Sequence, residues 1–256
     1  MRPSVTLEVL EAVHSPELGN SRDILVLLPP SYRSSRRSYP VVYMHDGQNL
    51  FDAEASFAGD WGVRRIMAAA ARRGLEAIVV GVPNMGPERL DEYSPFPDPG
   101  AGGGGRGDAY ARFVADTLKA LIDRRFRTRR ARDQTAIAGS SMGGLISLYA
   151  LVRHPATYGA AAVLSPSLWF AGGAIFSTIE RAPFVPARIY LDIGALEGPE
   201  HVGNARRMRD LLLAKGCQAE RDLRWLESRG GRHDERSWGR RFARALPFLL
   251  PAAQAT

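Results

Sequence analysis

TAIAGSSMGGL, residues 135–145, is the most informative stretch of this sequence, because it joins a strand-like run to a helix-like run through serines set among glycines. Its first four residues are small or β-branched, as at the end of a buried strand, and leucines recur at helical spacing from residue 145 onward. Gly139–Gly143 fits the pattern G-x-S-x-G with Ser141 in the centre. The stretch therefore predicts a sharp turn between a strand and a helix, with the hydroxyl of Ser141 exposed above it.

Two neighbouring serines, Ser140 and Ser141, compete for the centre of this turn. The residues two before and two after the centre lie against neighbouring strands, so glycine suits both places. With Ser141 in the centre these residues are Gly139 and Gly143, whereas with Ser140 in the centre one of them would be the bulky Met142. We therefore predict that Ser141 is a nucleophile.

Strand-like and helix-like segments alternate along the rest of the chain. The expected strands lie at 5–13, 22–32, within 39–49, and at 75–83, 135–138, 159–169, 187–198 and 221–228; the expected helices lie at 61–73, 108–126, 145–154, 202–215 and 235–249. This order predicts an α/β fold with a mostly parallel central sheet, an N-terminal antiparallel hairpin and helices on both faces. We expect one domain, residues 1–256.

Composition and charge exclude several classes of protein. The chain is 45% apolar and 24% charged, as in ordinary globular domains. Its net charge of +7 comes from arginines, which are densest at 124–133, but no motif there predicts a nucleic-acid partner. No leader-like or membrane-spanning apolar run is present, so no membrane partner is expected. The single cysteine, Cys217, excludes an internal disulfide and favours a cytoplasmic location.

A serine nucleophile needs a base, and histidine is the usual one. Of the five histidines, His233 lies in the glycine-rich stretch ESRGGRHDERSW, between the last expected strand and the last expected helix. A loop in this place leaves the carboxyl edge of a parallel sheet, where Ser141 is expected to be exposed. We therefore predict that His233 is the base.

The third member of such a site is a carboxylate that orients the histidine. The stretch IYLDIGALEG offers Asp192 inside its apolar run and Glu197 three residues beyond Gly194. A carboxylate in a loop can reach Nδ1 of His233, whereas one inside a core strand points into the packing of the sheet. Glu197 is the preferred candidate, and Asp192 stays open as the alternative.

Acyl transfer also needs hydrogen-bond donors for the oxyanion. The backbone N–H of Met142 directly follows Ser141, and a second donor is expected in the turn after the strand VVYMH, at the N–H of Gln48 or a close neighbour. His45 and Asp46 in the same turn lack further ligands at metal-binding spacing, so no metal site is predicted.

Six motifs together resemble the putative-esterase family of α/β-hydrolases, which includes esterase D-like, enterochelin-esterase-like and feruloyl or acetylxylan esterase-like proteins. They are YMHDGQNLFD, ERLDEYSP, GSSMGGL, SPSLWF, IYLDIGALEG and GGRHDERSW, and the resemblance extends over residues 22–250. It implies an α/β-hydrolase fold and a serine–acid–histidine hydrolase without a metal or cofactor. It carries Ser141, Glu197 and His233 over directly.

Two segments near the expected site hold candidate substrate contacts. Trp169 in SPSLWF either lines a pocket beside Ser141 or belongs to the core. Arg89 and Tyr93 lie in the first half of the long loop 84–108, where they contact substrate or only each other. The second half of that loop, PDPGAGGGGRG, has little to pack and is expected to be mobile.

The sequence therefore predicts a carboxylic ester hydrolase that acts on a small-molecule ester through an acyl-enzyme. An acyltransferase or a thioester hydrolase would use the same three side chains. A non-catalytic binding protein that keeps the fold is the alternative from another class, and the intact set of reactive side chains argues against it.

Overall fold

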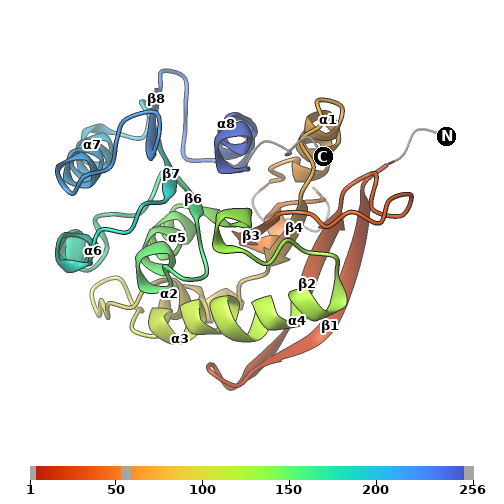
Figure 1. Ribbon diagram of the computed structural model, residues 1–256. Coiled ribbons are helices and arrows are strands. Elements are labelled where there is room, and N and C mark those ends of the chain that lie inside the picture. Colours follow the sequence, from red (N-terminus) through yellow and green to blue (C-terminus); the bar gives the residue numbers. More distant parts are fainter. Residues whose placement is uncertain (1–3, 53–58, 251–256) are drawn as a thin grey trace.

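The computed structural model describes residues 4–52 and 59–250. Within them the chain forms an eight-stranded sheet in the order β1-β2-β4-β3-β5-β6-β7-β8 (Figure 1). The strands are β1 (Thr6–Ser15), β2 (Asn20–Leu28), β3 (Val41–His45), β4 (Ile78–Val82), β5 (Thr135–Ser140), β6 (Ala160–Leu164), β7 (Arg188–Gly194) and β8 (Leu223–Ser228). β1 and β2 form an antiparallel hairpin, β2 is antiparallel to β4, and the pairs from β4 through β8 are parallel. The predicted mixed α/β sheet is confirmed.

Helices cover both faces of this sheet (Figure 1). They are α1 (Val63–Ala71), α2 (Arg89–Tyr93), α3 (Gly107–Arg112), α4 (Lys119–Arg125), α5 (Met142–Arg153), α6 (Phe170–Arg181), α7 (Pro199–Ala214) and α8 (Glu235–Leu249). Short turns add η1 (Gly47–Asn49), η2 (Gly86–Glu88), the π-helical η3 (Phe113–Leu118) and η4 (Arg132–Gln134). α1 and α8 pack on one face, and α3 to α7 pack on the other.

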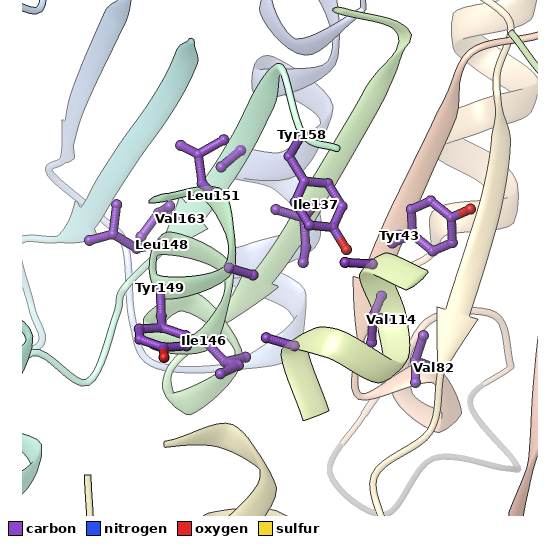
Figure 2. Packing of buried hydrophobic residues seen from close by; sticks show 14 of the residues in the cluster. Tyr43, Val82, Val114, Ile137, Ile146, Leu148, Tyr149, Leu151, Tyr158 and Val163 are labelled. Carbon is purple, nitrogen blue, oxygen red and sulfur yellow. The ribbon is translucent and has the colours of Figure 1, made fainter. Parts of the chain in front are cut away.

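The central strands are buried on both faces, so each face has its own core. Successive side chains of a strand point to opposite faces. In β3, Tyr43 belongs with Ile137 and Val163 to the core under the helices of one face (Figure 2), whereas Val42 and Met44 belong to the core beneath α1 and α8. Strands buried on both sides read as continuous apolar runs. Polar side chains that form a site are therefore expected mainly at the strand ends and in the loops that follow them.

The long loop after β4 differs from the expectation in its second half. Gly104 N donates to Asp91 Oδ1 at 2.8 Å, and Gly105 N donates to Ser94 O at 2.8 Å. A Cβ atom at Gly104, where φ is +99°, would lie 2.1 Å from the carbonyl oxygen of Phe96. The glycines allow a close approach of two backbone segments, and the segment expected to be mobile is instead tied to α2 and its neighbours.

Within residues 4–52 and 59–250, no helix has both the length and the apolar character needed to cross a membrane.

Candidate active site

Ser141 occupies the turn between β5 and α5. Its backbone has φ 57° and ψ −123°, a conformation that residues other than glycine rarely adopt. A Cβ atom at Gly139 would lie 2.6 Å from Gly143 O, so the two glycines must touch for the turn to form. Ser140 is the last residue of β5 and is buried. The geometry at Ser141 is the strained turn that G-x-S-x-G predicts.

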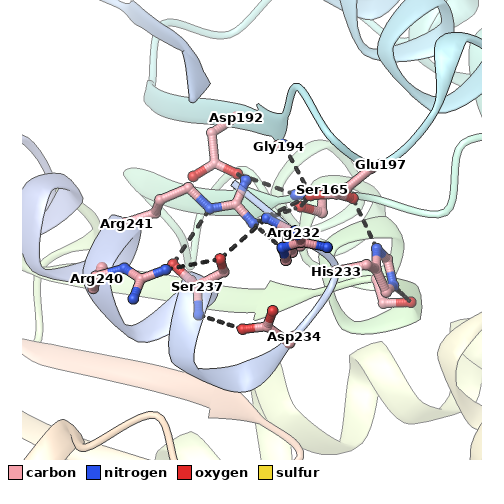
Figure 3. Close-up of polar contacts among 11 residues, drawn as sticks. Ser165, Asp192, Gly194, Glu197, Arg232, His233, Asp234, Ser237, Arg240 and Arg241 are labelled. Carbon is pink, nitrogen blue, oxygen red and sulfur yellow. Dashed lines mark hydrogen bonds and ion pairs between the residues drawn. The ribbon is translucent and has the colours of Figure 1, made fainter. Parts of the chain in front are cut away.

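A chain of contacts leads from Ser141 to a histidine and a carboxylate. Ser141 Oγ lies 3.0 Å from His233 Nε2. His233 Nδ1 lies 2.8 Å from Glu197 Oε2, and Figure 3 shows the imidazole turned towards that carboxylate. The imidazole also packs edge-on against the indole of Trp238, with ring centroids 4.8 Å apart. The three residues follow β5, β7 and β8. They meet because the carboxyl ends of parallel strands share one edge of the sheet.

Glu197 is held firmly on the side that faces away from His233. Its Oε1 accepts hydrogen bonds from the Ser165 hydroxyl at 2.6 Å and from Gly194 N at 2.8 Å. Burial alone would raise the pKa of this carboxyl, but hydrogen bonds from His233 and Ser165, with the nearby charges, hold it below its ordinary value. Glu197 is therefore ionised at neutral pH, with Oε2 directed at the imidazole.

Asp192, the alternative acid, lies inside β7 and has no exposed surface. Its Oδ1 lies 3.0 Å from Arg241 Nη1 and accepts a hydrogen bond from Ser165 N at 3.2 Å. Burial raises the pKa of Asp192 to about 7. The structure brings Glu197, rather than Asp192, to the imidazole.

The turn after β3 lies against the first turn of α5. Asp46 adopts a left-handed conformation with φ 54°, and its N–H donates to the Tyr93 hydroxyl at 2.9 Å. A Cβ atom at Gly143 would lie 3.4 Å from Asp46 Oδ2, which shows how closely the two turns approach. Gln48 lies in this turn, within η1, and its side-chain Oε1 accepts a hydrogen bond from Asn84 N. Met142 is the first residue of α5. Both predicted oxyanion residues thus belong to adjoining turns.

Arg89 fixes the position of Asp46. Its Nε and Nη2 atoms donate to the two carboxylate oxygens at 2.7 and 2.9 Å, and Asn84 Nδ2 donates to Oδ1 at 2.6 Å. Burial alone would raise the pKa of Asp46, but these hydrogen bonds and the charge of Arg89 lower it below the ordinary value. The turn after β3 therefore rests on a bidentate ion pair.

An open pocket of about 620 Å³ lies over Ser141. It is lined by Ser141 together with Arg89, Leu90, Asp98, Gly100, Ala101, Met142, Ser167, Trp169 and Phe170. Trp169 is 41% exposed, so it belongs to the pocket wall more than to the core. Tyr93 has no exposed surface, and its hydroxyl accepts the hydrogen bond of Asp46 N. It is not among the residues that line the pocket.

Sequence reasoning missed Ser165, Ser167 and Arg241. Ser167 Oγ lies 3.2 Å from Ser141 Oγ, and Ser167 N donates to Ser141 O at 3.0 Å. The pair of small hydroxyl residues in SPSLWF, directly after a strand, was an available signal for the two serines. Arg241 carried no comparable signal among so many arginines. Among the residues that the structure describes, no group of three or more metal-ligating side chains converges on one point.

A family model described as "Putative esterase" matches residues 15–249. The chain belongs to the putative esterase family. The matched range contains every residue of the site described above, and the assignment makes the chain a carboxylic ester hydrolase.

The chain is also similar to individual proteins and to a solved structure. The uncharacterized protein YbbA from Bacillus subtilis (strain 168) is 29% identical over 253 residues, which are 93% of this chain and 96% of YbbA. A siderophore enterobactin esterase from Emericella nidulans is 28% identical over 165 residues, or 58% of this chain and 52% of that protein. The crystal structure of the BES protein from Bacillus cereus matches with a TM-score of 0.74 at 20% identity, over 98% of this chain and 97% of that one. The last likeness shows a shared fold.

Proposed function

We propose that this protein hydrolyses small-molecule carboxylic esters through an acyl-enzyme on Ser141, with His233 as the base and Glu197 as the acid of the triad. The observation that carries the proposal is the unbroken series of contacts from Ser141 Oγ through both imidazole nitrogens to Glu197 Oε2. The strained backbone at Ser141 supports it, because such strain is maintained mainly at functional positions.

In this proposal each atom along the series of contacts has a role. An ionised Glu197 accepts the Nδ1–H of His233, which leaves the lone pair on Nε2 directed at Ser141 Oγ. The imidazole takes the hydroxyl proton as Oγ attacks the ester carbonyl, and it returns that proton to the departing alcohol. Water then attacks the acyl-enzyme while His233 takes a proton from it. The bond between the acyl carbon and Ser141 Oγ breaks, His233 returns the proton to Oγ, and the acid is released.

The oxyanion of each tetrahedral intermediate needs donors in fixed positions. We assign this role to the backbone N–H of Met142 and to an N–H of the η1 turn, at Gln48. The approach of Asp46 to Gly143 supports the assignment, because Asp46 directly precedes η1 and Gly143 directly follows Met142.

The pocket supports a small substrate. Its volume of about 620 Å³ suits a ligand of modest size, and the exposed indole of Trp169 offers a flat apolar surface beside Ser141. We infer that the ester carries a ring or another flat apolar group next to the scissile carbonyl. An acyltransferase or thioester hydrolase would use the same triad, so a panel of aryl acetate, feruloyl, acetyl-sugar, lactone and thioester substrates discriminates among these activities.

Labelling with a fluorophosphonate tests the nucleophile. The wild-type protein and Ser140→Ala should both be labelled and should both hydrolyse an aryl acetate. Ser141→Ala should lose the label, and its hydrolysis rate should fall by several orders of magnitude. Peptide mapping of the label should return Ser141. Equal loss of hydrolysis in the two folded variants, or a label on another residue, would contradict the proposal.

A further inference from the structure

Arg241, from α8, has a guanidinium that is buried beside the proposed triad. Its side chain is 3% exposed. Figure 3 shows the guanidinium between Asp192, Ser165 and the residue Arg232. Nη1 donates to Asp192 Oδ1 at 3.0 Å, and Nη2 is shared among Ser165 Oγ at 2.9 Å, Glu197 Oε1 at 3.3 Å and Arg232 O at 3.2 Å. Nε also donates to Ser237 O in the same helix at 3.4 Å. A buried cation with four further acceptors outside its own helix is a strong constraint on where those segments lie.

These contacts reach both partners of the proposed proton relay. Glu197 Oε1 accepts a hydrogen bond directly from Arg241. It also accepts one from the Ser165 hydroxyl, which itself accepts a hydrogen bond from Arg241. The carbonyl of Arg232 belongs to the residue just before His233. One side chain thus fixes the outer oxygen of the acid and the loop that carries the base.

Asp192 balances the charge of this guanidinium. It has no exposed surface, and its contact to Arg241 means that one cation lies between two carboxylates. Without Asp192, the guanidinium would pair with Glu197 alone and would attenuate the negative charge that Glu197 presents to the imidazole.

We infer that Arg241 and Asp192 form a positioning pair for the proposed triad. Arg241 fixes Glu197 and the loop of His233, and Asp192 neutralises Arg241 so that Glu197 keeps its full charge for the imidazole. This inference rests on the proposed function, because it assigns to the pair a task in the Ser141–His233–Glu197 relay. Neither residue touches the reacting atoms.

The two members of the pair should act on the imidazole with opposite signs. Removing the positive charge of Arg241 favours the protonated imidazole, so the acid limb of the pH–rate profile should move to higher pH. Removing the negative charge of Asp192 disfavours the protonated imidazole, so the limb should move to lower pH. The second shift should be smaller, because burial raises the pKa of Asp192 to about 7 and its charge is partly lost in this range.

Other charged and titratable groups face this cluster. Asp192 interacts electrostatically with Glu197 and Tyr190, and Tyr190 interacts also with Arg224 and Arg244. On the side of His233, Glu235 interacts with the imidazole and with Asp234 and Asp46. These groups are unchanged when Arg241 or Asp192 is replaced. Opposite shifts of the acid limb in the two variants would therefore come from the charges of Arg241 and Asp192.

The experiment is a pH–rate profile from pH 5 to 10, with one aryl acetate, for wild type, Arg241→Gln, Asp192→Asn and Arg240→Gln. Arg241→Gln should lower the plateau kcat by about 10- to 100-fold and should move the acid limb to higher pH by about one unit. Asp192→Asn should lower the plateau less and move the limb downward. Arg240→Gln removes an exposed arginine from the same helix and should leave the profile unchanged.

Arg241→Lys separates charge from geometry. It keeps the positive charge but loses the planar fork, so its acid limb should stay near that of wild type while its kcat falls. Should Arg241→Gln fail to fold, Asp192→Asn and Arg241→Lys still carry the test.

The proposed role of Arg241 and Asp192 would be wrong if the acid limb stayed in place in both Arg241→Gln and Asp192→Asn. It would also be wrong if the limb moved in the same direction in both variants. If Ser141→Ala is inactive in the same assay, such a result leaves the triad intact. Hydrolysis that survives Ser141→Ala would overturn the triad and the positioning pair with it.

Discussion

Two ion-pair clusters adjoin Ser141, and they are built from the same residue types in different proportions. Arg241 is shared by two carboxylates, Asp192 and Glu197, and its side chain is 3% exposed. Arg89 is 28% exposed and gives both of its forked donors to a single carboxylate, that of Asp46. A bidentate pair occupies both carboxylate oxygens and fixes a turn, whereas the shared guanidinium leaves one oxygen of Glu197 directed at a base. We call Arg89 with Asp46 the clamp cluster, and Arg241 with Asp192 and Glu197 the relay cluster. The two differ in how many carboxylates share one arginine.

The largest effect is expected from Glu197→Gln, which breaks the relay cluster where it meets His233. An amide cannot stabilise the charged imidazole as a carboxylate does, and the corresponding loss in a well-studied triad is about 10⁴-fold in kcat. Steady-state kinetics on one aryl acetate would measure it. Asp192→Asn serves as the matched control, with a much smaller loss. An inactive Asp192→Asn beside an active, folded Glu197→Gln would make the strand residue the acid.

Arg89→Ala tests the clamp cluster and should have an intermediate effect. Because Arg89 holds Asp46 beside the start of α5, its loss should let the proposed oxyanion turn relax and lower kcat by about 10- to 100-fold for every ester. Asp46→Asn should behave in the same way. A change confined to KM for acidic esters would show instead that Arg89 contacts substrate directly. Arg89 would then be a binding residue and not a residue that holds Asp46 in place.

The smallest effect concerns the pH dependence of stability at His45, which supports the clamp cluster from within the core. His45 Nδ1 lies 2.8 Å from the Tyr110 hydroxyl, and burial lowers the pKa of His45 to about 3. The unfolded chain takes up this proton near pH 6.5 and the folded chain does not. This residue's contribution to stability is therefore present above pH 6.5 and is lost as pH falls towards 3, at up to about 1.4 kcal/mol per pH unit.

His45→Gln removes this titration. Chemical denaturation at pH 7, 6 and 5 should give a flatter dependence of the unfolding free energy on pH for the variant than for wild type. Equal slopes would show that His45 is protonated in the folded protein.

Much of the fold followed from local patterns. The elbow at Ser141 was predictable because its backbone requires small residues at fixed distances along the chain, and Gly139 and Gly143 meet that requirement. The helix expected at 235–249 matches α8, because a strong apolar stripe and the N-cap Asp234 define its start. His233 and Glu197 were identified as candidates because loops after parallel strands converge on one edge.

Other features could not be read from neighbouring residues. The glycine run at 102–105 has the composition of a mobile tether, yet Gly104 lies where the carbonyl of Phe96 leaves no room for a side chain. Tyr93 shares a short helix with Arg89, but burial under Asp46 keeps it from the pocket.

The sequence alone determined the α/β order and the sharp turn at Ser141, and it pointed to the three side chains that the structure brings into contact, because each depends on residues close together in the chain or on the polarity of parallel strands. The tertiary structure decided what surrounds them. Arg241 and Glu197 are 44 residues apart, and nothing in either local sequence specifies that they meet. Their contact exists because α8 packs across β6 and β7 and brings a guanidinium to the end of a strand, where burial makes a partner for its charge obligatory.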